Sequence, residues 1–72
     1  MAMKTERVDA VTVKPGMRIV RGGTVWTVTA AWADNEREMG DVDAVTQVGE
    51  DTHGACFQFG DGETFEVVVE EG

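Results

Sequence analysis

The sequence predicts an all-β domain, a small antiparallel barrel of five to six strands. Val and Thr recur in short runs, and no stretch keeps an apolar period of 3.6 over three helical turns. Residues 13–28 alone have the pattern of three strands, the first two joined by a Pro-Gly turn and the last two by a Gly-Gly hairpin loop. Such a density of short strands and tight turns is typical of a small barrel.

The first strand is expected over residues 7–14 and is followed by a tight turn. Its apolar side chains divide between two faces, which indicates a bulge or a late start: Val8 and Ala10, against Val11 and Val13. Residues 14–17 have Pro and then Gly at the two central turn positions. Pro presets φ near −65° and Gly accepts positive φ, so the pattern predicts a type II turn.

The next hairpin can be given a register. If Gly22 and Gly23 form a two-residue loop, Arg21 lies opposite Thr24, and the pairing continues outward from there. Residues directly opposite each other share a face. This register therefore collects one apolar, inward face: Met17, Ile19, Trp26, Val28, Ala30 and Trp32.

A second hairpin is predicted between Ala55 and Val69. A three-residue loop over residues 60–62, with Gly62 left-handed at a bulge, opposes Phe57 with Phe65. This choice places the large apolar side chains of both strands on one face. A two-residue loop would mix the faces.

The remaining segments are described more coarsely. Residues 34–40 are expected to form one short helical turn, with Asn35 as its cap, or an open charged loop. Residues 41–48 are expected as a weaker strand and residues 49–54 as a loop. Residues 1–5 are expected as a disordered tail and residues 6–72 as a single domain.

The net charge of −8 is unevenly distributed. Residues 1–32 contain five Lys and Arg against two acidic residues, 5 − 2 = +3, whereas residues 33–72 contain Arg37 against twelve acidic residues, 1 − 12 = −11. Two explanations stay open. The charge keeps a small protein soluble and monomeric, or it engages a partner with a basic surface.

No catalytic or metal-binding group can be assembled from these residue types. His53 and Cys56 are the single His and the single Cys, whereas a structural zinc site needs four ligands. The acidic surroundings disfavour a reactive thiolate. The Gly-rich segments precede no helix and are interpreted as turns rather than phosphate loops. We therefore expect neither an enzyme nor a cofactor.

Candidate binding residues fall into two groups. The five Trp and Phe residues are expected in the core, but Trp32 ends its strand beside the acidic loop, where partial exposure would mark an interface. With it, the candidate partner-binding residues are Trp32, Asp34, Glu36, Glu38, Asp41, Asp43, Glu50 and Asp51. An alternative, weak nucleic-acid surface would use Lys14, Arg18 and Arg21.

The segments 14–19 and 22–28 resemble the opening of small SH3-like barrels, and specifically the KOW-like barrel that begins elongation factor P. Residues 57–67 complete a similar meander. In elongation factor P the loop after the third strand contains a lysine that acts in the ribosome. The corresponding region here, residues 33–41, has no lysine and is acidic. The chain is also similar to short barrel proteins encoded by phages of high-GC bacteria.

These observations predict a non-enzymatic binding module. The leading hypothesis is a phage-type protein that engages a basic protein surface through its acidic half. The alternatives are a weak nucleic-acid-binding barrel and a structural or oligomeric subunit. No apolar run approaches the roughly 20 residues of a membrane span, and residues 1–7 lack the apolar stretch of a signal peptide. We expect a cytoplasmic protein, in the bacterial host cytoplasm if it is phage-encoded, with no membrane partner.

Overall fold

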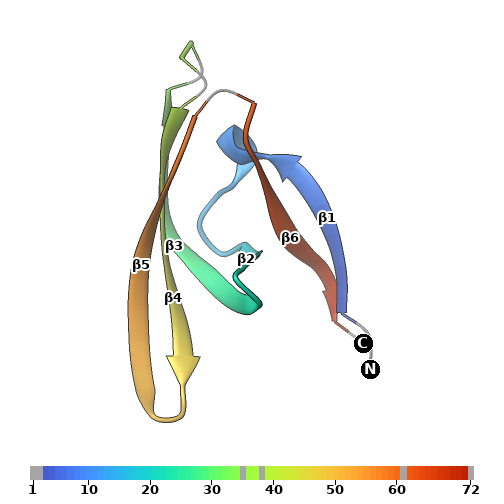
Figure 1. Ribbon diagram of the computed structural model, residues 1–72, viewed down its shortest axis with the longest axis vertical. Coiled ribbons are helices and arrows are strands. Elements are labelled where there is room, and N and C mark those ends of the chain that lie inside the picture. Colours follow the sequence, from blue (N-terminus) through green and yellow to red (C-terminus); the bar gives the residue numbers. More distant parts are fainter. Residues whose placement is uncertain (1–2, 35, 38, 61, 72) are drawn as a thin grey trace.

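The computed structural model describes residues 3–34, 36–37, 39–60 and 62–71 (Figure 1). Within these ranges it contains six strands and one short 3-10 helix, and neither an α-helix nor any helix long and apolar enough to cross a membrane. The elements, in chain order, are β1 (Met3–Asp9), η1 (Ala10–Thr12), β2 (Arg18–Arg21), β3 (Thr24–Asp34), β4 (Met39–Val48), β5 (Asp51–Phe59) and β6 (Thr64–Glu71).

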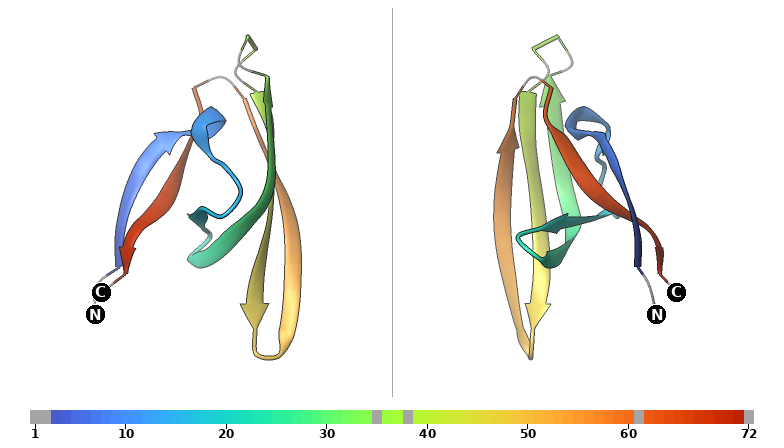
Figure 2. Two further views of the ribbon diagram at one scale, coloured as in Figure 1. Left: turned by 180° about the vertical axis from the view of Figure 1, so that it is seen from behind. Right: turned by 45° about the vertical axis from the view of Figure 1, so that its right-hand side comes forward.

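All six strands belong to one antiparallel sheet with the order β1-β6-β2-β3-β4-β5. The expected all-β class is therefore confirmed. The sheet curls so that β1 and β6 face β4 and β5 across the interior, with η1 near one end (Figure 2). It does not close into a complete barrel, because in the described chain the edge strands β1 and β5 do not pair with each other.

The hairpin of β2 and β3 has the predicted register. Arg21 pairs with Thr24 and Ile19 with Trp26, and both loop glycines have positive φ, 59° at Gly22 and 78° at Gly23. The preceding Pro-Gly turn also forms as predicted. Gly16 has φ 94°, and the Met17 amide donates to the Lys14 carbonyl at 3.2 Å. The Gly22–Gly23 turn fixes the register of the hairpin because two-residue primed loops match the twist of the strands.

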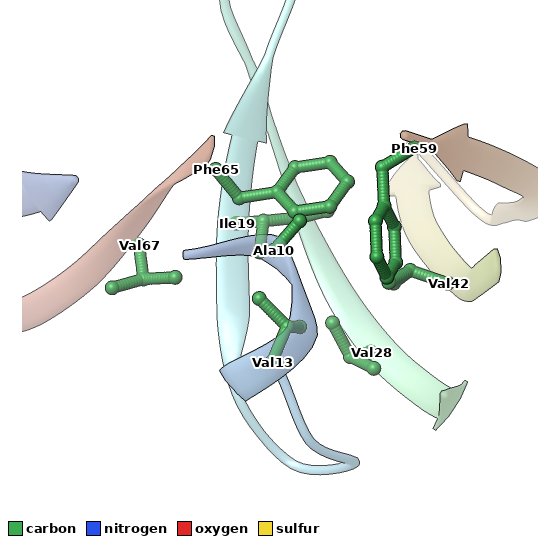
Figure 3. Packing of buried hydrophobic residues seen from close by; sticks show 8 residues of the cluster. All are labelled: Ala10, Val13, Ile19, Val28, Val42, Phe59, Phe65 and Val67. Carbon is green, nitrogen blue, oxygen red and sulfur yellow. The ribbon is translucent and has the colours of Figure 1, made fainter. Parts of the chain in front are cut away.

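Apolar side chains from η1, from the segment after it and from strands β2 to β6 meet in one core (Figure 3). The Phe59 and Phe65 rings contact edge to face, with centroids 6.0 Å apart, and so link β5 to β6. Ala10 of η1 and Val13, which follows η1, pack in the interior of the curled sheet. The buried cluster consists of Ala10, Val13, Ile19, Val28, Val42, Phe59, Phe65 and Val67.

The N-terminal elements differ from the prediction. β1 runs over Met3–Asp9 rather than over residues 7–14, and Met3–Thr5, expected in a tail, belong to it. These residues pair with β6 from Met3 opposite Glu71 onward, which gives their backbone groups partners. Residues 10–12 form η1 instead of continuing the strand, so the expected bulge is replaced by a 3-10 turn that buries Ala10 and Val13 together.

The second predicted hairpin is wrong in its pairing. β5 pairs with β4 along its whole length, and β6 pairs with β1 and β2, so Phe57 and Phe65 are not cross-strand neighbours. The left-handed conformation predicted for Gly62 is confirmed by its φ of 78°, whereas Asp61 of the predicted loop lies outside the described residues. The predicted face was also largely correct, because Phe59, Phe65 and Val67 are buried. The turn simply joins two strands that diverge.

Two other segments differ. Residues 51–54, expected in a loop, begin β5, because Gly49 at φ 64° allows a two-residue turn directly between Val48 and Asp51. The helical turn expected over residues 34–40 is not formed by the described residues, since β3 continues to Asp34 and β4 starts at Met39. The predicted cap, Asn35, lies outside the described residues.

Candidate binding surface

A β-bulge in β3 decides which side chains reach the surface. The pairing with β4 shifts between Val28 and Ala30, which makes Thr29 the extra residue, and the Thr29 hydroxyl donates to the Asp43 carbonyl at 3.2 Å. One extra residue exchanges the two faces of the strand beyond it. Ala33 therefore packs on the core, and Trp32, expected inside, is 58% exposed.

The exposed Trp32 lies among carboxylates. It pairs with Asp41, which in turn pairs with Gln58, so the three residues form one row across β3, β4 and β5. Asp43 lies two residues further along β4 and Met39 two residues before Asp41, on the same outward face. We call this surface the acidic face, and its residues are Trp32, Met39, Asp41, Asp43 and Gln58.

The negative charge of the acidic face is not balanced within its own strands. The fully described strands β3, β4 and β5 contain no Lys or Arg. Asp43 and the Trp32 ring are exposed, and Asp41 is half-buried. An exposed Trp flanked by solvated carboxylates combines an apolar anchor with a negative electrostatic potential that attracts cations.

Two hollows border Trp32. One is an open groove at the end of the sheet, bordered by Met39, Asp41, Gln58 and Glu63. The other lies against the segment around Lys14 and Pro15. The groove adds Glu63 to the acidic surroundings, a contribution that the sequence pattern did not reveal because it depends on the tertiary fold.

Asp34 has a structural role beside the acidic face. Its Oδ1 accepts hydrogen bonds from the backbone amides of Glu36 and Arg37 at 3.1 and 3.3 Å, and Arg37 Nε lies 3.8 Å from its Oδ2. Such a side-chain turn is the local chemistry that Asp favours. Asp34 thus shapes the turn after β3, Glu36 is exposed within that turn, and Glu38 lies outside the described residues.

Glu50 and Asp51 do not belong to the acidic face. They lie at the turn between β4 and β5, at the opposite end of these strands from the 34–39 turn (Figure 1). Ten positions separate Asp41 from Asp51, seven of them along β4 as far as Val48, which corresponds to about 23 Å of strand. The described members of the predicted set therefore divide between two regions.

His53 and Cys56 lie on opposite faces of β5. Cys56 is on the outward face opposite Asp43, whereas His53 has the parity of the inward residues. A hydrogen bond to the Asp43 carboxylate, then desolvation and the nearby charges of Asp43 and Asp41, raise the pKa of the exposed Cys56 thiol. The described residues contain no group of three or more potential metal-ligating His, Cys, Asp or Glu side chains.

The three basic candidates do not share one surface. Arg18 and Arg21 are three residues apart in β2 and so project to opposite faces. The Arg21 guanidinium lies over the Phe57 and Phe65 rings, 5.2 and 5.3 Å from their centroids, at the mouth of the core. Lys14 lies in the turn before β2. The geometry therefore does not assemble a basic rim.

Comparison of the chain with protein-family models, with curated proteins and with solved structures finds no match.

Proposed function

We propose that this protein is a non-enzymatic binding module whose acidic face engages a basic protein surface. The observation that supports the proposal is the exposed Trp32, which pairs with Asp41 and lies two residue pairs from Asp43 on the same face. Trp is among the residues that contribute most to binding at interfaces, and it is highly buried on average in folded proteins, whereas Trp32 is 58% exposed. Solubility alone explains carboxylates, but it does not explain an exposed indole among them.

The charge distribution supports the same partner class. Electrostatic attraction between the acidic strands and a basic partner would speed encounter and exclude acidic competitors. The groove beside Trp32 offers the partner a recessed contact surface. Met39, which is 43% exposed, is a second apolar contact there. Contact would then combine a buried apolar centre with a charged rim, which is the usual anatomy of a specific interface.

The finer fold assignment is part of this proposal. The last strand returns to lie between the first two, and β2 to β5 form a meander. This order is compatible with the SH3-like barrel that the sequence resembles. We propose that the protein is a phage-type barrel that modulates a host protein in the cytoplasm, a proposal supported by the turn pattern of residues 14–28.

The proposal is tested by capturing partners from bacterial lysate and then measuring the affinity of each purified partner. Two variants address the acidic face, Trp32→Ala and the double change Asp41→Asn with Asp43→Asn. The matched control is Glu50→Gln with Asp51→Asn, which removes the same charge from the distant turn. We expect the first two to weaken binding about tenfold and the control to change it little.

Salt dependence is the second arm. Between about 0.1 M and about 1 M salt the Debye length falls from about 10 Å to about 3 Å, so a complex formed through the acidic face should weaken steeply. Partners that bind equally well at both salt concentrations, or that respond to the control pair as strongly as to Asp41 and Asp43, would refute the acidic face as the binding surface.

A further inference from the structure

The two edge strands of the sheet differ in how they are protected against pairing with another chain. β1 has an irregular register between Lys4 and Thr5 and contains four charged side chains, Lys4, Glu6, Arg7 and Asp9. Charges and bulges are the usual means by which sheet edges avoid further pairing. β1 thus has the features of an edge strand that does not pair with another chain.

β5 has neither an irregular register nor a series of charged side chains. Its nine residues pair with β4 without a register shift, from Gly40 opposite Phe59 to Val48 opposite Asp51. It contains no Pro, Lys or Arg, and Asp51 at its start is its one acidic residue. Every second residue of such an edge directs its N–H and C=O away from the sheet. β5 therefore presents a long, regular row of backbone hydrogen-bonding groups.

The side chains along β5 define what an added strand would meet. On the outward face lie Cys56 and Gln58, which pair with Asp43 and Asp41. On the inward face lies Phe57, half-buried against the Trp26 ring with centroids 5.3 Å apart, and the Arg21 guanidinium lies 5.2 Å from the Phe57 centroid. A strand beside β5 would place alternate side chains near the carboxylates and over the flank of Phe57.

Resting on the proposed function, we propose that β5 is where the basic partner binds, by adding an extended segment of alternating basic and apolar residues to the sheet. Basic side chains would lie on the outward face, about two strand spacings or roughly 10 Å from β4, within reach of Asp41 and Asp43. Apolar side chains would lie on the inward face, beside Phe57. The backbone groups of the partner would supply affinity, and its alternation would supply specificity.

A second copy of the chain is the competing occupant of this edge. Two molecules of net charge −8 joined at β5 would bring their acidic faces together on one continuous sheet. Like charges repel at this range. Charge complementarity therefore favours a basic segment over self-association.

The test uses three synthetic peptides of about eight residues, the usual length of a strand, titrated against the full chain. The first alternates Lys and Val. The second is identical except that backbone nitrogens on one edge are methylated, which removes their hydrogen-bond donors. The third has the same composition with the Lys and Val residues in two separate blocks. Affinity and hydrogen exchange of the β5 amides are measured for each.

We expect the alternating peptide to protect the β5 amides and to bind at least about tenfold more tightly than the methylated or blocked peptides. Asp41→Asn with Asp43→Asn should weaken it, and Glu50→Gln with Asp51→Asn should not. If all three peptides bind alike and lose affinity in salt, strand addition is refuted while the acidic-face proposal stands.

Two further outcomes would also overturn the inference. One is protection of the β1 amides instead of those of β5. The other is a stable dimer in sedimentation whose β5 amides are protected without any peptide, which would assign the edge to a second copy. The captured partners of the acidic face are measured separately, so failure of the proposed function itself would appear there and not in the peptide comparison.

Discussion

At the scale of single residues, Gly40 shows how closely neighbouring strands of this sheet approach each other. A Cβ at this position would collide with the backbone oxygen of Trp32 and would lie 2.8 Å from Ala33 Cα and 2.9 Å from Phe59 Cζ. Two of these neighbours are backbone atoms of the paired strand, so they cannot move without distorting the sheet. We expect Gly40→Ala to lower the free energy of unfolding by about 1–3 kcal/mol, as overpacking does.

Urea denaturation checks this prediction, with Gly54→Ala as the matched control. Gly54 also lies within a strand, but the nearest atom to its added Cβ is the Ala44 carbonyl oxygen at 4.0 Å. Its substitution should leave stability unchanged or slightly increased, because Ala loses less backbone entropy than Gly. Equal midpoints for the two variants would contradict the close approach at Gly40.

The Cys56 thiol should react slowly with alkylating reagents. Its pKa is raised by the hydrogen bond to Asp43, by desolvation and by the charges of Asp43 and Asp41, so less thiolate is present at any given alkaline pH. The rate of iodoacetamide modification should therefore rise with pH later than for an unstructured thiol. Asp43→Asn should move the profile to lower pH, and Asp41→Asn should move it less. A profile unchanged by Asp43→Asn would contradict the contact.

Glycine positions were the most predictable residues, and Trp32 was the least. Gly16, Gly22, Gly23 and Gly62 all have the positive φ that turn chemistry required, because few other residues accept it. The bulge at Thr29 has no such signal, since neither Gly nor Pro marks it. A single unmarked extra residue was enough to move Trp32 from the expected core to the surface.

At the scale of elements, local patterns predicted faces and turns better than partners. The β2–β3 register followed from the two-residue loop, which leaves the adjoining strands no alternative. The pattern around Phe57 and Phe65 predicted their inward direction, but alternation is identical whichever strand lies alongside. β6 pairs with β1 and β2, contacts that are far apart in sequence and cannot be derived from turn chemistry.

Arg21 links elements that share no hydrogen-bond ladder. Its guanidinium lies over rings from β5 and β6, strands that do not pair, and so closes part of the seam between them. We expect Arg21→Ala to lower the free energy of unfolding by about 1 kcal/mol, from two exposed cation–π contacts and the packing of the aliphatic stem. Thermal unfolding followed by circular dichroism measures the effect.

Lys14→Ala is the control for Arg21, since it removes the same charge from an exposed turn. Because both variants raise the net negative charge equally, the difference between them isolates the ring contacts. Arg21→Lys should fall between wild type and Arg21→Ala, because an ammonium stacks less well on aromatic faces than a guanidinium. If Lys14→Ala were as destabilising as Arg21→Ala, net charge rather than stacking would explain the loss.

At the scale of the whole molecule, the fold converts a charge gradient along the chain into a spatial one. The acidic C-terminal half contributes β4, β5 and β6. The acidic face on β3, β4 and β5 lies at the opposite end of the β4–β5 hairpin from the turn that contains Glu50 and Asp51. The sequence could indicate the excess of carboxylates but not this division, because it depends on the length of the β4–β5 hairpin.

The same charge should make stability depend on salt. The sequence has fourteen acidic residues and six basic ones, so it carries excess negative charge. These negative charges repel one another more in the compact folded state than in the expanded unfolded chain. We expect the melting temperature to rise by about 4–8 °C between about 0.01 M and about 0.5 M NaCl, which corresponds to about 1 kcal/mol for a domain of this size. Glu50→Gln with Asp51→Asn should raise the low-salt value and flatten the dependence, since two adjacent carboxylates at one turn are removed. A melting temperature that stays constant or falls with added salt would show that the carboxylates are already compensated in the folded state, and it would remove the field on which recognition of a basic partner depends.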